Sequence, residues 1–377
     1  MIPRIYQNLD AYLAPQKALV IFGARQTGKT TLLKNYLAKT KFRYRFETGD
    51  DIRIQHLIGS GDLTQLKEYA SGYELIVIDE AQRIPNIGLG LKLLIDQITP
   101  LRIIVTGSSS FELAGQVGEP LTGRKKTLTL FPIAQLELAM MNNPFEMKKQ
   151  LDDFLIYGSY PAVITATSKK EKLSILDELV HSYLLKDVFE LERVKSPKTL
   201  FDLLRLLAFQ VGSEVSLSEL GTQLSIDAKT VARYLDLLEK AFVLFNLRGY
   251  AGNLRKEIVK KSKYYFFDNG IRNTIISNVN PINLRDDQGK LWENFLVIER
   301  KKMQAYRDML SNNYFWRTWE KDELDWLEER EGALFGFEYK YSAQKKKLSK
   351  KFLEAYPHAT IEVITRENYL PFVGIDS

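Results

Sequence analysis

The sequence of 377 residues contains no cysteine and only three histidines. Without cysteine there is no disulfide framework and no thiolate metal site, and three histidines leave little material for an imidazole site. No apolar run approaches the roughly 20 residues that a membrane-spanning helix needs. Residues 1–16 carry charges and tyrosines where a secretory signal would need an apolar block. We therefore expect a soluble, cytoplasmic protein with no membrane partner.

Length and charge set two further expectations. The chain is too long for one ordinary core, and its hydrophobic content of 45% supports two or three folded domains. The net charge of +6 favours a nucleic-acid partner without establishing one.

The clearest motif is the stretch ALVIFGARQTGKTTLL at residues 18–33. Its central part fits G-x-x-x-x-G-K-[ST], preceded by an apolar strand and followed by a helix. In such a loop, backbone N–H groups and a helix N-terminus converge on the phosphates, Lys29 adds a positive charge, and Thr30 can hold Mg²⁺. An ordinary strand-turn-helix is the alternative, but both flanks favour phosphate binding. The residues expected to bind ATP are Gly23, Ala24, Arg25, Gln26, Thr27, Gly28, Lys29, Thr30 and Thr31.

Two acids follow a second apolar run, LIVIDE, at residues 75–80. Four consecutive apolar residues are typical of a parallel strand covered by helices on both faces, and ligands bind at the carboxyl ends of such strands. Asp79 is therefore expected to hold Mg²⁺, and Glu80 to orient or deprotonate the attacking water. Two acids can also simply begin a turn, but the phosphate loop favours the catalytic interpretation.

Further polar residues follow another predicted strand at residues 102–106. Ser108 and Ser109 come directly after it and could sense the γ-phosphate. Arg124 precedes an alternating segment at residues 126–131, which predicts a fifth strand. It is a candidate arginine finger, although a solvated surface arginine is the alternative. Because a finger acts on nucleotide held by a neighbouring subunit, we expect a homo-oligomer.

The segments GARQTGKTTLL, LIVIDEAQ, TGSSS and LTGR, in this order, resemble the AAA-type ATPases of archaea and bacteria that carry a conserved C-terminal domain. The resemblance implies an α/β core over residues 1–133, with a parallel sheet in the order 5-1-4-3-2. It also implies ATP and Mg²⁺ as cofactors, Glu80 as the catalytic base, and Ser108 or Ser109 as the polar sensor.

Residues 134–196 are predicted to form a helical connector, and residues 197–284 a winged helix. Within the second segment, two helices separated by a short turn precede two strand-like stretches. A winged helix would place Lys229, Thr230 and Arg233 against DNA, whereas the alternative is a protein-contact module. Basic residues in and after the predicted wing support DNA contact; they are Arg248, Arg255, Lys256, Lys260, Lys261 and Lys263.

Residues 285–377 are predicted to begin with a helix and continue with three strands. Asp325, Glu338 and Lys340 match the pattern D…(D/E)-x-K, and Glu293 matches its accompanying helix acid. These features resemble the restriction-endonuclease-like fold, which Holliday junction resolvases also use. The acids could hold Mg²⁺ and Lys340 could stabilise charge or assist the water. Such folds also bind DNA without cleaving it, and both interpretations stay open.

The alternation in the last of these strands predicts one aromatic core face and a second face that presents Glu338 and Lys340. Taken together, the sequence predicts an ATPase that couples Mg-ATP turnover to binding or remodelling of DNA, including branched DNA such as Holliday junctions. The alternative is a nucleotide-switched regulatory or scaffolding protein whose C-terminal half binds protein.

Overall fold

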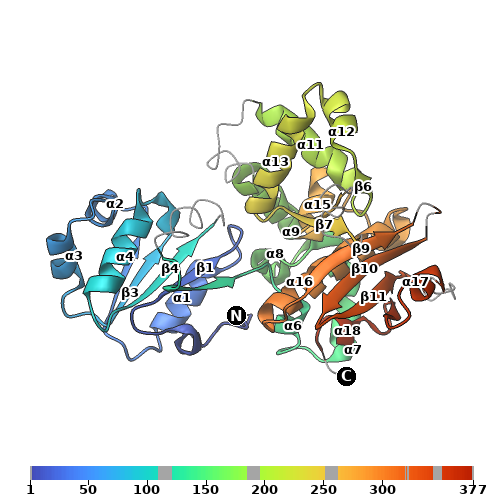
Figure 1. Cartoon of the computed structure of the whole chain (residues 1–377). Helices are drawn as coiled ribbons and strands as arrows, with labels where there is room; N and C mark the ends of the chain where they lie inside the picture. Colours follow the sequence, from blue (N-terminus) through green and yellow to red (C-terminus); the bar gives the residue numbers. More distant parts are fainter. Residues whose placement is uncertain are drawn as a thin grey trace.

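The computed structural model places an N-terminal α/β unit beside a larger C-terminal half (Figure 1). It describes residues 2–108, 121–184, 196–250, 262–318, 320, 322–342 and 350–375. Ser109 lies outside these ranges, as do Arg255, Lys256, Lys260 and Lys261 of the predicted wing. Among the described residues, no helix has both the length and the apolar character needed to cross a membrane.

The N-terminal unit is built on a parallel sheet of five strands in the order β2-β3-β4-β1-β5. This is the predicted order 5-1-4-3-2 counted from the other edge, so the α/β prediction is confirmed. The strands are β1 (Ala18–Phe22), β2 (Tyr44–Thr48), β3 (Leu75–Asp79), β4 (Arg102–Gly107) and β5 (Lys125–Thr129). Every residue of β1 and β3 is buried, as expected where helices cover both faces of a parallel sheet.

Alternate residues of the central strands pack against different helices. Leu19, Ile21 and Val77 belong to the same core as the apolar residues of α1 (Lys29–Leu37). Val20, Ile76 and Ile78 pack with the helices on the opposite face. Those helices are α2 (Ile52–Gly59), α3 (Leu63–Ala70) and α4 (Ile87–Gln97). Helices therefore cover both faces of the N-terminal sheet, and the carboxyl ends of β1, β3 and β4 lie at the same edge.

The described part of the predicted connector, residues 134–184 and 196, contains several helices and a turn that favours glycine. Gly158 has φ 74°, and a Cβ there would lie 2.0 Å from an oxygen of Asp268. The Asp268 carboxylate accepts the Ser159 N–H at 2.6 Å, so this turn is tied to the C-terminal half. The connector elements are α6 (Gln135–Leu138), α7 (Pro144–Tyr157), α8 (Pro161–Thr165), α9 (Lys169–Glu178) and the π-helical Leu179–Leu184.

The C-terminal half contains a mixed sheet of seven strands, in the order β12-β11-β10-β9-β7-β8-β6. The strands are β6 (Glu214–Val215), β7 (Leu244–Gly249), β8 (Ser262–Phe266), β9 (Asn312–Arg317), β10 (Glu323–Arg330), β11 (Ala333–Tyr339) and β12 (Thr360–Ile364). Arg248 and Gly249 of β7 lie parallel to Tyr314 and Phe315 of β9. One sheet thus joins strands from both sides of the predicted boundary after residue 284.

Helices α11 to α13 precede β7, and α16 precedes β9 (Figure 1). In α13, Val231, Leu235 and Leu238 are buried as the periodicity predicts, and Lys229 and Arg233 are exposed. The helices of this half are α11 (Pro197–Phe209), α12 (Leu217–Leu224), α13 (Ala228–Lys240), α15 (Asn269–Ile275), α16 (Gln288–Tyr306), α17 (Lys350–Ala355) and α18 (Tyr369–Phe372). Helix α16 is thus followed by three strands, α17 and β12.

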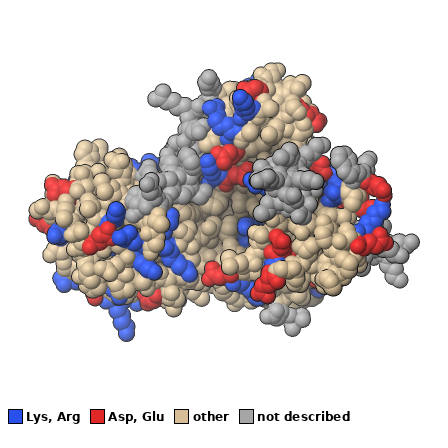
Figure 2. Space-filling view, viewed as in Figure 1, with Lys and Arg blue, Asp and Glu red and all other residues tan. Residues whose placement is uncertain are grey.

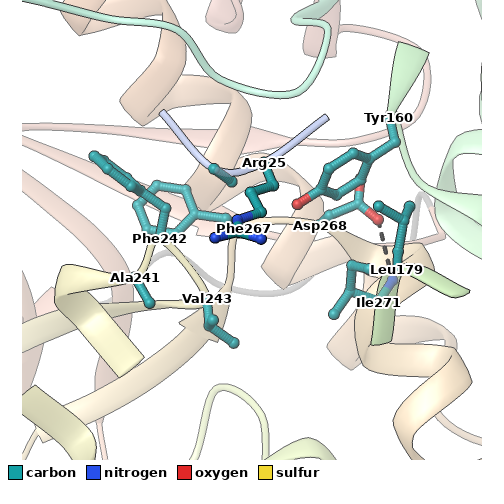
Figure 3. A pocket seen from close by; sticks show the side chains of 10 residues that line it. Arg25, Tyr160, Leu179, Ala241, Phe242, Val243, Phe267, Asp268 and Ile271 are labelled. Carbon is teal, nitrogen blue, oxygen red and sulfur yellow. Dashed lines mark hydrogen bonds between the residues drawn. The ribbon is translucent and has the colours of Figure 1, made fainter. Parts of the chain in front are cut away.

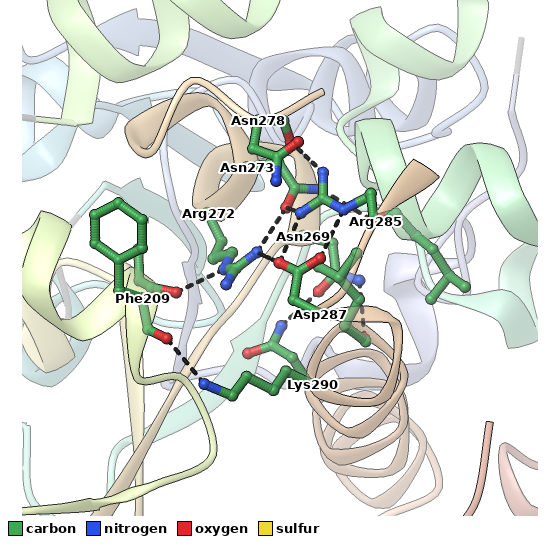
Figure 4. A network of polar contacts seen from close by, with 12 residues as sticks. Phe209, Asn269, Arg272, Asn273, Asn278, Arg285, Asp287 and Lys290 are labelled. Atoms are coloured by element: carbon green, nitrogen blue, oxygen red, sulfur yellow. Dashed lines mark hydrogen bonds and ion pairs between the residues drawn. The ribbon is translucent and has the colours of Figure 1, made fainter. Parts of the chain in front are cut away.

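A buried polar network ties α11, α15 and the start of α16 together (Figure 4). Asp287 forms ion pairs with Arg272 and with Arg285, whose side chains are 1% and 0% exposed. Arg272 also donates to the Ala208 carbonyl at 2.7 Å, and Lys290 to the Phe209 carbonyl at 3.1 Å. Burial opposes ionisation of Asp287, but the two arginines outweigh it and lower the pKa of Asp287 to about 2.

Candidate functional site

The phosphate loop occupies residues 23–30, between β1 and α1. A Cβ at Gly23 would lie 2.1 Å from the Leu130 carbonyl oxygen, so the strand leaving β5 passes too close for any side chain. Gly28 has φ 94° at the N-cap of α1, a left-handed conformation that glycine adopts at little cost. The two glycines of the motif therefore shape the loop in the way that phosphate binding requires.

Lys29 lies over the loop rather than out in solvent. Its ammonium donates to the carbonyls of Gly23 at 2.8 Å and Ala24 at 2.9 Å, and the residue is 5% exposed. The buried Thr27 hydroxyl donates to the Ala24 carbonyl at 2.9 Å. Carbonyl oxygens are neutral, so anionic phosphate oxygens would be stronger partners for this ammonium.

Asp79 is held between two threonine hydroxyls. Thr30 donates to one carboxylate oxygen at 2.6 Å, and Thr106 donates to the other. Thr106 also accepts the Glu80 N–H at 3.2 Å. A hydroxyl and a carboxylate from Thr30 and Asp79 are the oxygen ligands that Mg²⁺ prefers beside nucleotide phosphates, so these two residues fit a magnesium ion.

Glu80 begins a short 3-10 turn with a left-handed backbone, φ 52°. Gln82 in that turn donates to the Glu80 carboxylate at 2.5 Å and to the buried Ser108 hydroxyl at 3.2 Å. One amide therefore connects the expected base to the expected sensor. Sequence reasoning did not single out Gln82 or Thr106. Only the parallel register of β3 and β4, which brings the ends of both strands together, could have pointed to Thr106.

The remaining loop residues and Arg124 occupy different positions. Gln26 and Thr31 are exposed, and Arg25 is half-buried. Arg124 does not join this site, because it precedes β5 at the amino end of the sheet and pairs with Asp96 at 2.7 Å. Its role as a finger toward a neighbouring subunit stays a prediction.

Arg4 links the phosphate loop to the C-terminal half, and no sequence signal pointed to it. Its guanidinium donates to the carbonyls of Thr27 and Phe131, each at 2.6 Å. It also donates to Glu137 at 2.8 Å and to the Tyr306 hydroxyl at 3.2 Å. Burial acts to lower the pKa of Arg4, but Tyr306 and Glu137 outweigh burial and raise that pKa.

A second contact involves the other side of the loop. The Arg25 side chain enters a pocket of the C-terminal half, where its guanidinium lies beside Phe242 and Phe267 (Figure 3). Tyr160 and Asp268 also line this pocket. The loop is thus contacted from two directions by residues outside the N-terminal sheet.

The acids of the predicted nuclease-like segment gather on the second sheet. Asp325 accepts the Tyr339 N–H at 2.7 Å, and the Lys340 ammonium lies 3.5 Å from a Glu338 oxygen. Burial and the nearby charge of Glu293 raise the pKa of Asp325 to about 7. Among the described residues, no three histidine, aspartate or glutamate side chains are grouped so as to hold a metal ion. Cleavage by these residues, and DNA binding without cleavage, stay the two alternatives that the sequence offers.

One sequence expectation about this half is wrong. Lys263 is 2% exposed and lies among acids, so it cannot be one of the basic side chains that face DNA. The error arises because distant segments pack over β8. Glu338 and Tyr339 lie on opposite faces of β11 and are 5% and 6% exposed, so both faces of this strand are covered there.

On α13, Lys229 and Arg233 are exposed, but Thr230 is engaged locally. Its hydroxyl donates to Asp227 at 2.7 Å and its N–H to the same carboxylate at 2.8 Å. Thr230 is therefore part of the helix cap, and Lys229 and Arg233 are the exposed ones of the three predicted contacts.

Comparison with known families bears on the N-terminal site. Residues 15–139 match the model of the AAA domain. This match supports an ATPase of the AAA type and, with it, use of a nucleotide. Residues 148–282 and 288–374 match two separate domains of unknown function. The first of these spans most of the predicted connector together with the predicted winged helix.

Similar full-length proteins are uncharacterized. One from Mycobacterium tuberculosis is 28% identical over 325 residues, which cover 85% of this chain and 70% of that protein. One from Methanocaldococcus jannaschii is 24% identical over 344 residues, covering 86% of this chain and 74% of that protein. Among solved structures, a Walker-type ATPase of Pyrococcus abyssi is 15% identical with a TM-score of 0.44, covering 68% of this chain and 90% of that one. That likeness is too low to carry its properties to this chain.

Proposed function

We propose that this protein hydrolyses ATP with Mg²⁺ and uses the turnover to bind or remodel DNA through its C-terminal half. The convergence of Lys29, Thr30, Asp79 and Glu80 at the carboxyl edge of one parallel sheet carries the proposal. The AAA domain match supports the ATPase part. The choice of DNA as the partner rests on the arrangement of the C-terminal half.

The phosphate loop would bind the triphosphate through its N–H groups and Lys29. The ammonium would exchange the carbonyls of Gly23 and Ala24, at 2.8 and 2.9 Å, for phosphate oxygens. Thr30 and Asp79 would hold Mg²⁺, which neutralises charge on the phosphates when bound. The Thr106 hydroxyl, donating to Asp79, keeps that carboxylate oriented toward Thr30.

Glu80 would take the proton of the attacking water. Its backbone N–H is fixed on Thr106 at 3.2 Å, and Gln82 holds its carboxylate. Because Gln82 also donates to Ser108, a change at the γ-phosphate near Ser108 would alter the position of the Glu80 carboxylate. Gln82 is therefore a positioning residue in this proposal.

Coupling to the C-terminal half would run through the loop itself. Arg4 joins the Thr27 carbonyl to Glu137 and to Tyr306 of α16, and Arg25 enters the pocket beside Phe242. Phosphate binding changes the surroundings of this loop. The C-terminal half therefore has direct contacts through which it could respond to the nucleotide.

DNA is favoured by the order of elements around α13. A helix, a short strand, two helices and two antiparallel strands, with β8 between β7 and β6, is the order of a winged helix. Lys229 and Arg233 are exposed on α13, the second helix of the α12–α13 pair. On the face seen in Figure 2, basic and acidic side chains are mixed rather than gathered in one broad field. DNA contact would thus depend on a few local cations.

The test compares ATP hydrolysis and binding on single-stranded, duplex and four-way junction DNA at several salt concentrations. We expect at least one DNA to stimulate hydrolysis, with an affinity that falls steeply with salt. Replacing both Lys229 and Arg233 by alanine should reduce the stimulation, whereas Lys198→Ala, which removes an exposed cation of α11, should not. A rate of ATP hydrolysis that does not change with any of these DNAs would favour the alternative, a nucleotide-switched scaffold that binds protein. The homo-oligomer also stays a prediction.

A further inference from the structure

Lys263 is a buried cation in the second sheet, on the strand next to the edge strand β6. It lies on β8, which pairs with β7 on one side and β6 on the other, and it is 2% exposed. Its ammonium forms ion pairs with Glu323 and, at 3.5 Å, with Glu293. Two carboxylates in contact with one buried amine favour its charged form, so the geometry is that of an ammonium held by ion pairs.

The partners of Lys263 come from different elements on the far side of the predicted domain boundary. Glu293 belongs to α16, and Glu323 and Asp325 belong to β10. The Lys263 ammonium also lies 5.2 Å from the centre of the Phe315 ring on β9. One ammonium is thus enclosed by two strands and a helix that follow it in the chain.

Glu293 and Asp325 each have one carboxylate oxygen engaged by another protein group. Glu293 accepts the Tyr265 hydroxyl at 2.7 Å on the same oxygen that faces Lys263. Asp325 accepts the Tyr339 N–H at 2.7 Å. A divalent ion needs several carboxylate oxygens free to turn toward it, and it would be repelled by an ammonium held among those oxygens.

We propose that the Lys263 ammonium occupies the place of a divalent cation in this acidic centre, where it offsets part of the carboxylate charge, so that the centre holds no metal. Glu293 and Asp325, two of the residues that a metal-dependent nuclease would use, then serve to bind β8 to α16 and β10. The nuclease-like segment is on this account a structural and binding module. The inference is independent of the ATPase proposal, because it concerns a different sheet.

The test titrates Mn²⁺ into the full-length, nucleotide-free protein and follows thermal unfolding and bound Mn²⁺. All variants carry Asp79→Asn, so that the N-terminal site does not contribute. We expect no stabilisation by Mn²⁺ in this parent, and a rise in melting temperature with one more bound Mn²⁺ in Lys263→Ala, where the acids are freed. Adding Asp325→Asn should abolish that gain. Lys340→Ala, which removes the cation paired with Glu338, is the matched control and should gain nothing.

Three results would overturn the proposal. The first is a parent that Mn²⁺ stabilises and that loses the effect on Asp325→Asn; this comparison leaves Lys263 untouched and so holds even if Lys263→Ala does not fold. The second is a folded Lys263→Ala that binds no additional Mn²⁺. The third is metal-dependent nicking of DNA by the wild-type protein that disappears in Asp325→Asn.

Discussion

The N-terminal unit and the C-terminal half each bury a lysine, but the two lysines have different partners. Lys29 donates to the neutral carbonyls of its own loop, at 2.8 and 2.9 Å, while Lys263 is paired with Glu293 and Glu323. Phosphate can replace a carbonyl, because a charged acceptor binds an ammonium more strongly than a neutral one. A carboxylate offers no such advantage to an incoming ligand. Residue type alone therefore does not tell a ligand-binding lysine from a structural one.

The largest effect is expected from Lys29→Ala. Loss of the ammonium should weaken ATP binding and reduce hydrolysis by on the order of a hundredfold or more, the scale seen when one donor to transition-state charge is removed. Calorimetric ATP binding and phosphate release measure both effects. Lys34→Ala, an exposed lysine later in α1, is the control and should behave as wild type. Normal ATP binding by Lys29→Ala would contradict the conclusion that Lys29 binds a ligand whereas Lys263 is structural.

Glu80→Gln should separate binding from turnover. Without a base, hydrolysis should fall by about a hundredfold to ten-thousandfold while ATP still binds. Gln82→Ala leaves the base but removes its 2.5 Å hydrogen bond, so its rate should lie between those of wild type and Glu80→Gln. Single-turnover hydrolysis rates, measured by rapid quench, together with the ATP affinity of each variant test both expectations. Wild-type rates in Glu80→Gln would remove this residue from the role.

Asp287→Ala tests a third buried charge centre, in which one acid serves two cations. Removing it leaves Arg272 and Arg285 buried without their counter-charge, which should lower the free energy of unfolding by about 3 to 5 kcal/mol. Its pKa is about 2 when folded and higher when unfolded, so its contribution is present above about pH 4. That contribution should be lost as the pH falls toward 2. Denaturant unfolding of wild type and variant across this range should converge at the acid end.

The smallest effect is expected at Glu239, an acid that forms no ion pair with any residue in the described part of the chain. Burial raises the pKa of Glu239 to about 7, so the folded state favours its protonated form. The stability it contributes is therefore full below about pH 4 and is lost as the pH rises through 7. Glu239→Gln should flatten this loss in unfolding curves taken from pH 5 to 8. A variant whose stability falls as steeply as that of wild type would contradict the assignment.

Sequence alone could propose the N-terminal site but not its surroundings. The phosphate loop and the acids at the end of β3 are local motifs, so Gly23 to Thr30, Asp79 and Glu80 could be proposed from neighbouring residues, and the structure brings Thr30 and Asp79 into contact. The strand order followed from a resemblance, not from the pattern itself. Arg4 acts through residues more than a hundred positions away, including Glu137 and Tyr306, and no local pattern marks such contacts.

The basic stretch before β8 shows why the C-terminal half was harder to predict. Because Lys263 follows Lys260 and Lys261 in the sequence, it was predicted to be an exposed residue of the wing. Its burial comes from strands and a helix that follow much later, together with the acids at Glu293 and Glu323. Charge composition cannot show which lysine or arginine will form an ion pair with an acid far away in the sequence.

The position of Lys263 also has a consequence for folding during synthesis on the ribosome. Its counter-charges on β10 are made about sixty residues later, which takes roughly three to twelve seconds at about 5 to 20 residues per second. Until then, Glu293 is the one of these partners already made, and burying an ammonium that lacks its counter-charges on β10 would be costly, so we expect the nascent segment to keep that lysine in water. We therefore expect a ribosome-bound chain arrested before Glu323 to be cut readily by protease around β8, and one arrested past residue 342 and beyond the exit tunnel to resist it. Translation order would thus delay the first half of this sheet until the second half arrives.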